Sequence, residues 1–233
     1  MIFMKRGKFI VVEGIDGSGK GEQFKLLLRR LQKEGFKIAT FDFPQYGKPS
    51  AFFVERYLNG RYGTLKEVGP YKASIFYALD RFDVGPKIKN WIDSGRVVVS
   101  NRYVPSNMGH QGAKIENVGE RKKYLQWVHD FEYGIMGIPK PNASVILHVP
   151  ANIAYYLIGK KRSRKYLGGK QRDIHEGSIE HLQRAERTYL EMAKMFPKDF
   201  VIVECVKNNK LLTIGEIHEK IWKEVKKILG AKA

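Results

Sequence analysis

The stretch VVEGIDGSGKGEQ, residues 11–23, joins an apolar run to an amphipathic segment. Gly14, Gly19 and Lys20 have the spacing G-x-x-x-x-G-K, which is typical of a loop whose backbone N–H groups surround phosphate oxygens. The motif requires a strand before the loop and a helix after it, and the flanking patterns predict both. We therefore predict a nucleoside triphosphate site in which Lys20 is catalytic. The predicted residues of this triphosphate site are those of the whole loop: Gly14, Ile15, Asp16, Gly17, Ser18, Gly19, Lys20 and Gly21.

Two other interpretations of the loop remain open. A glycine-rich turn between strand and helix can exist without a ligand, and dinucleotide-binding loops are also rich in glycine. Glycines at 17, 19 and 21 give G-x-G-x-G rather than G-x-G-x-x-G, which disfavours a dinucleotide. Gly21 also lacks the hydroxyl that usually reaches magnesium at this position. We expect Mg²⁺ to be bound mainly by phosphates and water, with Glu13 and Asp16 as the nearest acids.

Composition limits the class of protein. Hydrophobic residues make up 43% of the 233 residues, which is enough for a full core. The net charge of +18 favours phosphorylated ligands, nucleic acid or an acidic membrane as partners. The lone Cys205 has no partner for an intramolecular disulfide. No segment resembles a signal peptide or a membrane span, so we expect a cytoplasmic protein with no membrane contact.

Short apolar runs alternate with amphipathic segments along the chain. This pattern predicts an α/β fold in which helices flank a parallel sheet of about five strands. We find no repeat or linker, so we expect a single domain over residues 1–233. The predicted strands cover residues 8–14, 36–43, 96–100, 143–149 and 200–205. Predicted helices follow the loop and cover residues 70–93, 120–132, 179–195 and the C-terminal segment from Ile214.

Four further stretches, together with the loop EGIDGSGK, carry a resemblance to a known family. They are FDFPQYG (41–47), YKASIFYALDRF (71–82), VVVSNRYVPSNMGHQGAK (97–114) and RDIHEGSIEHLQRAERTYLEMA (172–193). In this order they resemble the thymidylate kinases, P-loop nucleoside monophosphate kinases that transfer a phosphoryl group from ATP to dTMP. The resemblance runs from about residue 9 to 195 and continues weakly to the C-terminus. It implies ATP and dTMP as substrates and a homodimer.

The resemblance also implies roles for individual residues at the acceptor site. Asp16 would accept a hydrogen bond from the 3′-hydroxyl, and Tyr77 would stack on thymine. Arg81, four residues after Tyr77 on the same helix face, would reach the base oxygen O4. Arg102 would bind the acceptor phosphate and act in catalysis. The remaining expected substrate contacts are Asn107 and Gln111 at the base edge, and His110, whose bulk disfavours a ribose 2′-hydroxyl.

Each of these residues also has a structural explanation. Tyr77, beside Phe76, is also compatible with an ordinary aromatic side chain in a buried helix, although the neighbouring motif favours the functional interpretation. Arg81 and Arg102 are also compatible with surface ion pairs, the commonest environment of an arginine. His110 is compatible with a purely structural histidine.

A basic segment at residues 160–172, KKRSRKYLGGKQR, contains no acidic residue. On composition alone it is a solvated basic loop or a nucleic-acid contact. In the family pattern it falls at the lid that closes over ATP. Some thymidylate kinases place an arginine directly after the loop aspartate, where this chain has Gly17. The predicted catalytic arginines are therefore those of the lid: Arg162, Arg164 and Arg172.

The chain departs from the family pattern near the expected phosphates. Asn101 stands where the family usually has an aspartate that helps to hold magnesium. After Phe43-Pro44 the family often has an arginine, whereas this chain has Gln45, with Lys48 as the nearest cation. His148 ends a predicted strand where an acid is frequent.

These departures leave alternatives to dTMP phosphorylation. The protein is expected to be slow, to choose another acceptor, or to depend unusually on metal concentration, and an inactive nucleotide-binding relative remains an alternative. A basic nucleic-acid-binding or nucleotide-sensing protein is a further hypothesis from a different class. No helix-turn-helix, zinc pattern or ribonucleoprotein motif supports it, so nucleic acid is not the expected partner.

Overall fold

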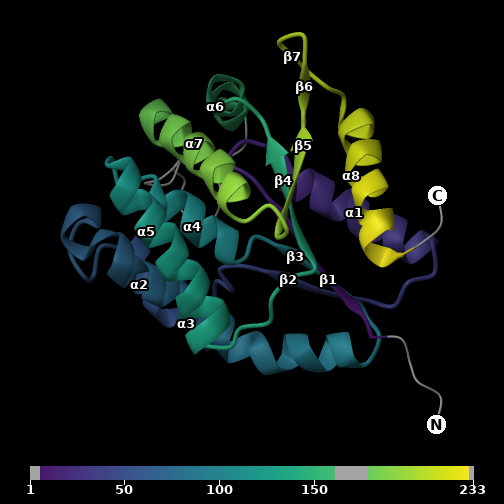
Figure 1. Cartoon of the computed structure of the whole chain (residues 1–233), viewed down its shortest axis with the longest axis horizontal. Helices are drawn as coiled ribbons and strands as arrows, with labels where there is room; N and C mark the ends of the chain where they lie inside the picture. Colours follow the sequence, from purple (N-terminus) through teal and green to yellow (C-terminus); the bar gives the residue numbers. More distant parts are fainter. Residues whose placement is uncertain (1–5, 161–177, 231–233) are drawn as a thin grey trace.

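The computed structural model describes residues 6–160 and 178–230 of the chain. Within these ranges, five parallel strands form one sheet in the order β2-β3-β1-β4-β5 (Figure 1). Helices flank the sheet, which confirms the predicted three-layer α/β fold. The strands are β1 (Lys8–Glu13), β2 (Ile38–Asp42), β3 (Val97–Asn101), β4 (Ala143–His148) and β5 (Phe200–Glu204).

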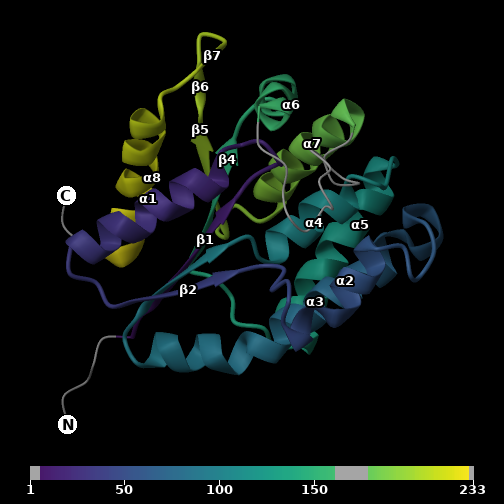
Figure 2. The ribbon, with the colours of Figure 1, turned by 180° about the vertical axis from the view of Figure 1, so that it is seen from behind.

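Helices cover both faces of the sheet. The α-helices of the described ranges are α1 (Lys20–Lys33), α2 (Phe52–Leu58), α3 (Leu65–Asp93), α4 (Val104–Gly112), α5 (Val118–His129), α6 (Ala151–Gly159), α7 (Ile179–Met195) and α8 (Ile214–Leu229). Opposite views agree that α1 and α8 lie on one face, and that α3, α4, α5 and α7 lie on the other (Figures 1 and 2).

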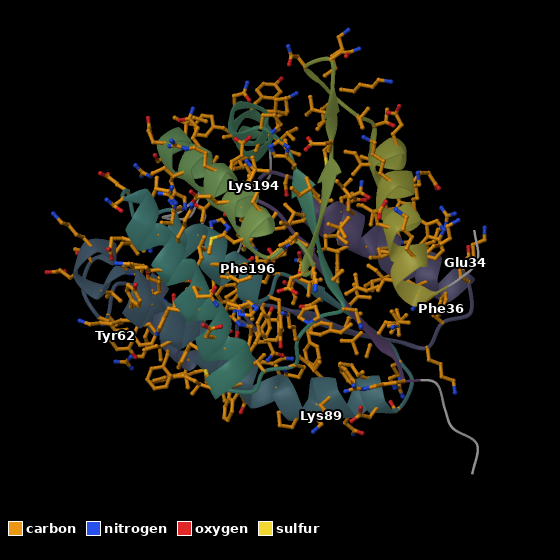
Figure 3. The ribbon with its side chains drawn as sticks, in the orientation of Figure 1. Glu34, Phe36, Tyr62, Lys89, Lys194 and Phe196 are labelled. Carbon is orange, nitrogen blue, oxygen red and sulfur yellow. The ribbon has the colours of Figure 1, made fainter. Side chains whose placement is uncertain are left out.

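The middle strands are apolar on both faces because both faces are covered. Phe9, Ile10, Val11 and Val12 of β1 are all fully buried. The side chains of the strands and helices fill the space between the layers (Figure 3). The carboxyl ends of the strands, where ligands bind in such sheets, therefore rest on a rigid base.

The long helix α3 is interrupted near its start. Thr64 begins it with a reciprocal capping box, because its hydroxyl accepts from the backbone N–H of Glu67 while the Glu67 carboxylate accepts from that of Thr64. Gly69 then leaves the helical conformation at φ 70° and ψ 171°, and the helix resumes at Pro70. The predicted helix start at residue 70 is therefore the restart after the break.

The sequence pattern did not predict helix α4, and its close packing explains why. This helix contains Pro105 and two glycines, and nearly all of its residues are buried. A Cβ at Gly109 would lie 2.4 Å from the ring of Tyr189 on α7. The two helices can approach only because that position has no side chain, so the glycine reflects tertiary packing rather than a loop.

Other elements also follow from context. The predicted helix at 120–132 is α5, which continues into a π-helical turn, η2 (Asp130–Ile135). A short 3-10 turn, η1 (Pro49–Ala51), precedes α2. After β5 a two-stranded hairpin projects from the sheet edge, formed by β6 (Val206–Lys207) and β7 (Lys210–Leu211) (Figure 1).

No helix in the described part of the chain combines the length and the apolar character needed to cross a bilayer. The predicted lid at 160–172 lies outside the described residues except for Lys160, so Arg162, Arg164 and Arg172 have no described position.

Candidate active site

A cleft of about 680 Å³ opens at the carboxyl ends of β1, β2 and β3. The glycine-rich loop after β1 lines one end of it, and side chains of α3 and α4 line the other. The predicted site residues that line it are Asp16, Gly17, Gly19, Lys20, Gly21, Tyr77, Arg81, Arg102, Asn107, His110 and Gln111.

The loop leaves the first turn of α1 open to a ligand. Gly19 occupies the N-cap position of α1 with φ 80°, and no side chain caps the helix. The N-cap residue itself therefore offers no side-chain acceptor to the first N–H groups of the helix, and an anion can accept hydrogen bonds there. A Cβ at Gly17 would lie 2.3 Å from the Ala154 carbonyl oxygen, so this glycine lets the loop pack against α6. A Cβ at Gly21, by contrast, would meet no atom within 4 Å.

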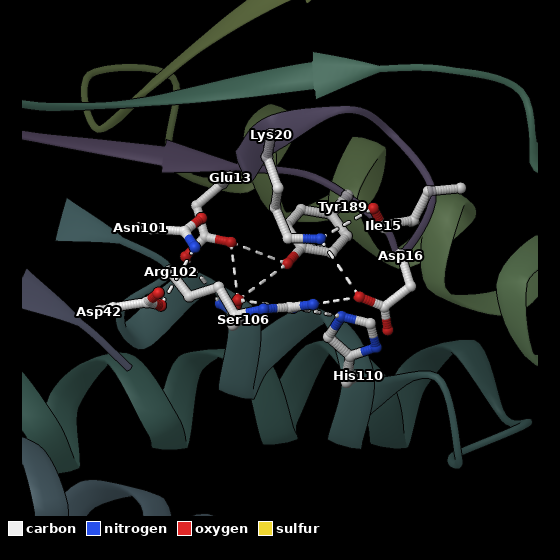
Figure 4. Close-up of polar contacts among 10 residues, drawn as sticks. All are labelled: Glu13, Ile15, Asp16, Lys20, Asp42, Asn101, Arg102, Ser106, His110 and Tyr189. Carbon is white, nitrogen blue, oxygen red and sulfur yellow. Dashed lines mark hydrogen bonds and ion pairs between the residues drawn. The ribbon is translucent and has the colours of Figure 1, made fainter. Parts of the chain in front are cut away.

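Lys20, Asp16 and Arg102 form a charged cluster at the loop (Figure 4). The Lys20 ammonium donates to the Ile15 carbonyl at 3.0 Å and to Asp16 at 3.2 Å, and the Arg102 guanidinium also donates to Asp16. Burial alone would raise the pKa of Asp16, but Arg102 and Lys20 outweigh it and hold this pKa well below its usual range. Asp16 is therefore ionised and faces two cations.

Arg102 has a strained backbone at the end of β3. Its φ of 64° lies in the left-handed region, which costs a non-glycine residue roughly 1 kcal/mol or more. Hydrogen bonds hold this conformation, since its N–H donates to the Val12 carbonyl and its carbonyl accepts from the Ser100 hydroxyl. Its guanidinium also lies 3.2 Å from Nε2 of His110. Arginine only donates, so that histidine nitrogen is the acceptor.

Glu13 lies beneath the loop with no exposed surface. Its two carboxylate oxygens accept hydrogen bonds from the backbone N–H groups of Tyr103 and Ser106 and from the hydroxyls of Ser106 and Tyr189. Burial raises its pKa, while the charge of Arg102 and these hydrogen bonds oppose that shift. Glu13 therefore joins β1, α4 and α7, and its oxygens are already used by protein donors.

The other end of the cleft contains a buried polar network. Glu132, which has no exposed surface, accepts from Arg81 at 2.6 and 2.7 Å and from the Asn107 amide at 2.9 Å. The Asn107 Nδ2 also donates to the Ser74 carbonyl. A carboxylate only accepts, so Asn107 must direct its NH₂ group towards Glu132. Its Oδ1 is buried, and within residues 6–160 and 178–230 it has no hydrogen-bond partner.

Tyr77 and Gln111 complete this end of the cleft. Tyr77 is partly buried and packs edge-on against Tyr57 with ring centres 6.2 Å apart. Lys114 donates to the Gln111 Oε1 at 2.6 Å and to the Tyr57 hydroxyl at 2.8 Å. Burial lowers the pKa of Lys114 to about 8. Because Lys114 uses the Gln111 oxygen, the NH₂ group of that amide is the part left to contact a ligand.

Two residues at which this chain departs from the family pattern contact a charged side chain. Asn101 donates to Asp42 at 3.0 Å, and the oxygen of Gln45 accepts from Lys48 at 3.2 Å. Asp42 and Lys48 both line the cleft. Asn101 stands where the family usually has an acid, and it contacts the acid Asp42. Gln45 stands where the family often has an arginine, and it contacts the cation Lys48.

Sequence reasoning missed Glu132 and Asp42. Glu132 lies in the π-helical turn η2, and only its fully buried carboxylate reveals its role. Asp42 ends β2, which places it at the ligand-binding edge of a parallel sheet, so its position offered a usable signal.

Comparison with known proteins agrees with this geometry. The family model "Thymidylate kinase" matches residues 12–221. Thymidylate kinase of Mycobacterium tuberculosis is 32% identical over 186 residues, which cover 79% of this chain and 85% of that protein. A probable thymidylate kinase of Thermococcus gammatolerans is 30% identical over 222 residues, covering 92% and 94%.

A solved structure of thymidylate kinase from Candida albicans has a similar fold, with a TM-score of 0.70 at 20% identity over 95% of this chain and 92% of that chain. The chain belongs to the thymidylate kinase family, as its sequence motifs predicted.

Proposed function

We propose that the protein transfers the γ-phosphoryl group of ATP to dTMP, giving ADP and dTDP. The observation that carries this proposal is one cleft with a phosphate-binding loop at one end and a matched set of base-reading groups at the other. Membership of the thymidylate kinase family supports both substrates. A nucleic-acid-binding role and a changed acceptor are not favoured.

Hydrogen-bond direction at the base end favours thymine. Asn107 presents Oδ1, an acceptor, because Glu132 and Ser74 take its NH₂ group. Arg81 can only donate. Thymine has a donor at N3 and an acceptor at O4, which complement these two groups, whereas cytosine has the opposite pair. Tyr77 offers an aromatic ring for stacking on the base.

Phosphate binding would rearrange the charged cluster. The loop N–H groups and Lys20 would contact the ATP phosphates, and Arg102 and Lys48 would contact the acceptor phosphate. These phosphates compete with Asp16 for its two cations, which releases its carboxylate for the 3′-hydroxyl. The bulk of His110 disfavours a 2′-hydroxyl. Direct in-line transfer needs no covalent intermediate, and arginines among Arg162, Arg164 and Arg172 are proposed to stabilise the developing charge.

Mg²⁺ is the proposed cofactor. Bound with ATP, it would neutralise part of the phosphate charge and so favour transfer of the phosphoryl group. The first metal ligand predicted, Glu13, is a poor candidate because protein donors occupy both of its oxygens. Asp16, the second, is balanced by Lys20 and Arg102.

An acceptor panel tests the proposed function. Purified protein with Mg-ATP is assayed on dTMP, dUMP, dCMP, dGMP and thymidine, with Lys20→Ala as the control. We expect dTMP to be the best acceptor, dUMP to follow because it shares the N3 and O4 pattern, and dCMP and thymidine to be poor. Preference for dCMP, dGMP or thymidine over dTMP, or turnover no better than the control, would contradict the proposal.

A homodimer through the outer face of α3 is also proposed. Tyr71, Ile75 and Phe82 are exposed, and their spacing places them on one side of this helix. Light scattering during gel filtration should give twice the monomer mass, and Phe82→Glu should shift the protein to the monomer. A wild-type mass equal to that of one chain would contradict this proposal.

A further inference from the structure

Asp42 and Asn101 form a polar pair where two neighbouring strands end. They are register partners on the parallel strands β2 and β3, and the N–H of Phe43 donates to the Asn101 carbonyl at 3.1 Å. The Asn101 Nδ2 donates to the Asp42 Oδ1 at 3.0 Å. Both residues line the cleft, next to Arg102 in the cluster of Figure 4. The sheet itself therefore fixes the pair at the edge where phosphates are expected.

The hydrogen bond determines which oxygen atoms the pair offers. Asn101 must direct its NH₂ group to Asp42, because a carboxylate only accepts. The remaining amide atom, Oδ1 of Asn101, is buried and has no hydrogen-bond partner among the residues that the structure describes. A buried acceptor without a donor is costly, so a bound group that supplies one would stabilise it. A carboxylate beside an amide oxygen is a hard donor set that suits Mg²⁺, whose retained waters also donate hydrogen bonds.

The other acids near the loop have different partners. Among the described residues that line the cleft, the acidic side chains are Asp16 and Asp42. Asp16 faces Lys20 and Arg102, and Glu13 uses both oxygens within the protein. Asp42 accepts a hydrogen bond from the Asn101 amide, which brings no charge of its own to the pair.

We propose that Asp42, positioned by Asn101, is the carboxylate that holds the hydrated magnesium ion of the bound Mg-ATP. The family pattern has an acid at position 101, at the end of β3, whereas in this chain the acid is Asp42, at the end of the neighbouring strand β2. Asn101 keeps a part in the site as an uncharged acceptor. This inference rests on the proposed function for its nucleotide, but it does not depend on the acceptor.

Manganese binding tests the site without any turnover. Mn²⁺ affinity is measured for the complex of the full-length protein with a non-hydrolysable ATP analogue, from the loss of the free Mn²⁺ electron paramagnetic resonance signal. Asp42→Asn should weaken Mn²⁺ binding by about tenfold or more, because a charged ligand is lost. Analogue binding without metal should be unchanged. Equal Mn²⁺ affinity in the wild type and Asp42→Asn would overturn the proposal.

Two variants make the result specific. Glu22→Gln removes another carboxylate, in the first turn of α1, that does not line the cleft, and it should leave Mn²⁺ affinity unchanged. The exchange Asp42→Asn with Asn101→Asp keeps the net charge and the pairing, and should recover most of the lost affinity. A loss caused by Glu22→Gln, or no recovery on exchange, would contradict the assignment.

The same assay separates this proposal from the proposed function. Failure of every acceptor, with Mn²⁺ still bound through Asp42, would remove the kinase activity but keep the metal site. Strong dTMP phosphorylation by the wild type, together with normal Mn²⁺ binding by Asp42→Asn, would keep the kinase activity and overturn the metal site.

Discussion

The base end and the phosphate end of the cleft stabilise their charges in different ways. At the base end, Arg81 and Glu132 are paired deep in the protein, and this pair holds Asn107 in one orientation. At the phosphate end, Asp16, Lys20 and Arg102 contact one another in the space where phosphates are expected. The base end is thus built in advance for one hydrogen-bond pattern, while the phosphate end exchanges partners when ligands enter.

The two ends also differ in how they relate to the family pattern. The base end has the residues that the family resemblance implies, whereas the phosphate end has amides at Asn101 and Gln45. Each amide contacts a charged neighbour, Asp42 or Lys48. The phosphate end therefore keeps one acid and one cation, but they are at other sequence positions than in the family pattern.

The largest effect should come from the phosphate end. Lys20→Ala removes the mobile cation from the loop, and we expect kcat to fall on the order of 10²–10³-fold. The matched control is Lys25→Ala, an exposed lysine of the same helix, which should retain full activity. Steady-state kinetics with dTMP measure both variants. A Lys20→Ala enzyme with nearly normal kcat would mean that the loop does not hold the reacting phosphates.

Breaking the base end should mainly affect stability and base choice. Glu132→Gln leaves the buried Arg81 charge without its partner, and we expect about 3 kcal/mol of lost unfolding free energy, measured by urea denaturation. Asn107 also loses its fixed orientation, so the preference for dTMP over dCMP in kcat/KM should narrow. An unchanged preference would show that Glu132 is only structural.

His148 provides a smaller test outside both ends. It bridges Glu204 at 2.7 Å and Glu186 at 3.0 Å, and chiefly the hydrogen bond to Glu186 raises its pKa to about 9. The raised pKa stabilises the fold fully below pH 6.5, and this contribution disappears as the pH rises through about 9. His148→Gln should therefore cost about 1–2 kcal/mol at pH 6 and almost nothing at pH 10, allowing for partial solvent exposure. Equal costs at both pH values would contradict the ion pairs.

The smallest expected effect is tighter binding of Mg²⁺ at the phosphate end. Gly21→Ser restores the hydroxyl usual at this loop position, and the open space around Gly21 accommodates it. We expect the Mg²⁺ concentration at half-maximal rate to fall a few-fold, roughly the effect of one added neutral ligand. Gly215→Ser, in the first turn of α8, controls for added side-chain bulk, because a Cβ there would also meet no atom within 4 Å. An unchanged or higher Mg²⁺ requirement would place the metal away from position 21.

The sequence predicted the elements whose periodicity is strong. All five sheet strands and the helices α1, α3, α5, α7 and α8 follow from apolar patterns. It did not predict α4, because its glycines and proline resemble a loop until the packing of Gly109 against Tyr189 is known. The single-domain organisation stays a prediction.

The site residues that could be predicted are those that belong to a local sequence pattern. The loop and the Tyr77–Arg81 spacing are local patterns that can be read along the chain. Glu132 and Asp42 act through partners that are 51 and 59 positions away in sequence, and no local pattern reports such contacts. The roles of the lid arginines also stay predictions.

The most direct test is a crystal structure of the protein with dTMP and ADP bound. Thymine should lie on the ring of Tyr77, with N3 at about 3 Å from the Asn107 Oδ1 and O4 facing Arg81. The ADP phosphates should lie in the loop that ends at Lys20. A base bound elsewhere, or an Asn107 amide turned so that its NH₂ group meets N3, would contradict the account.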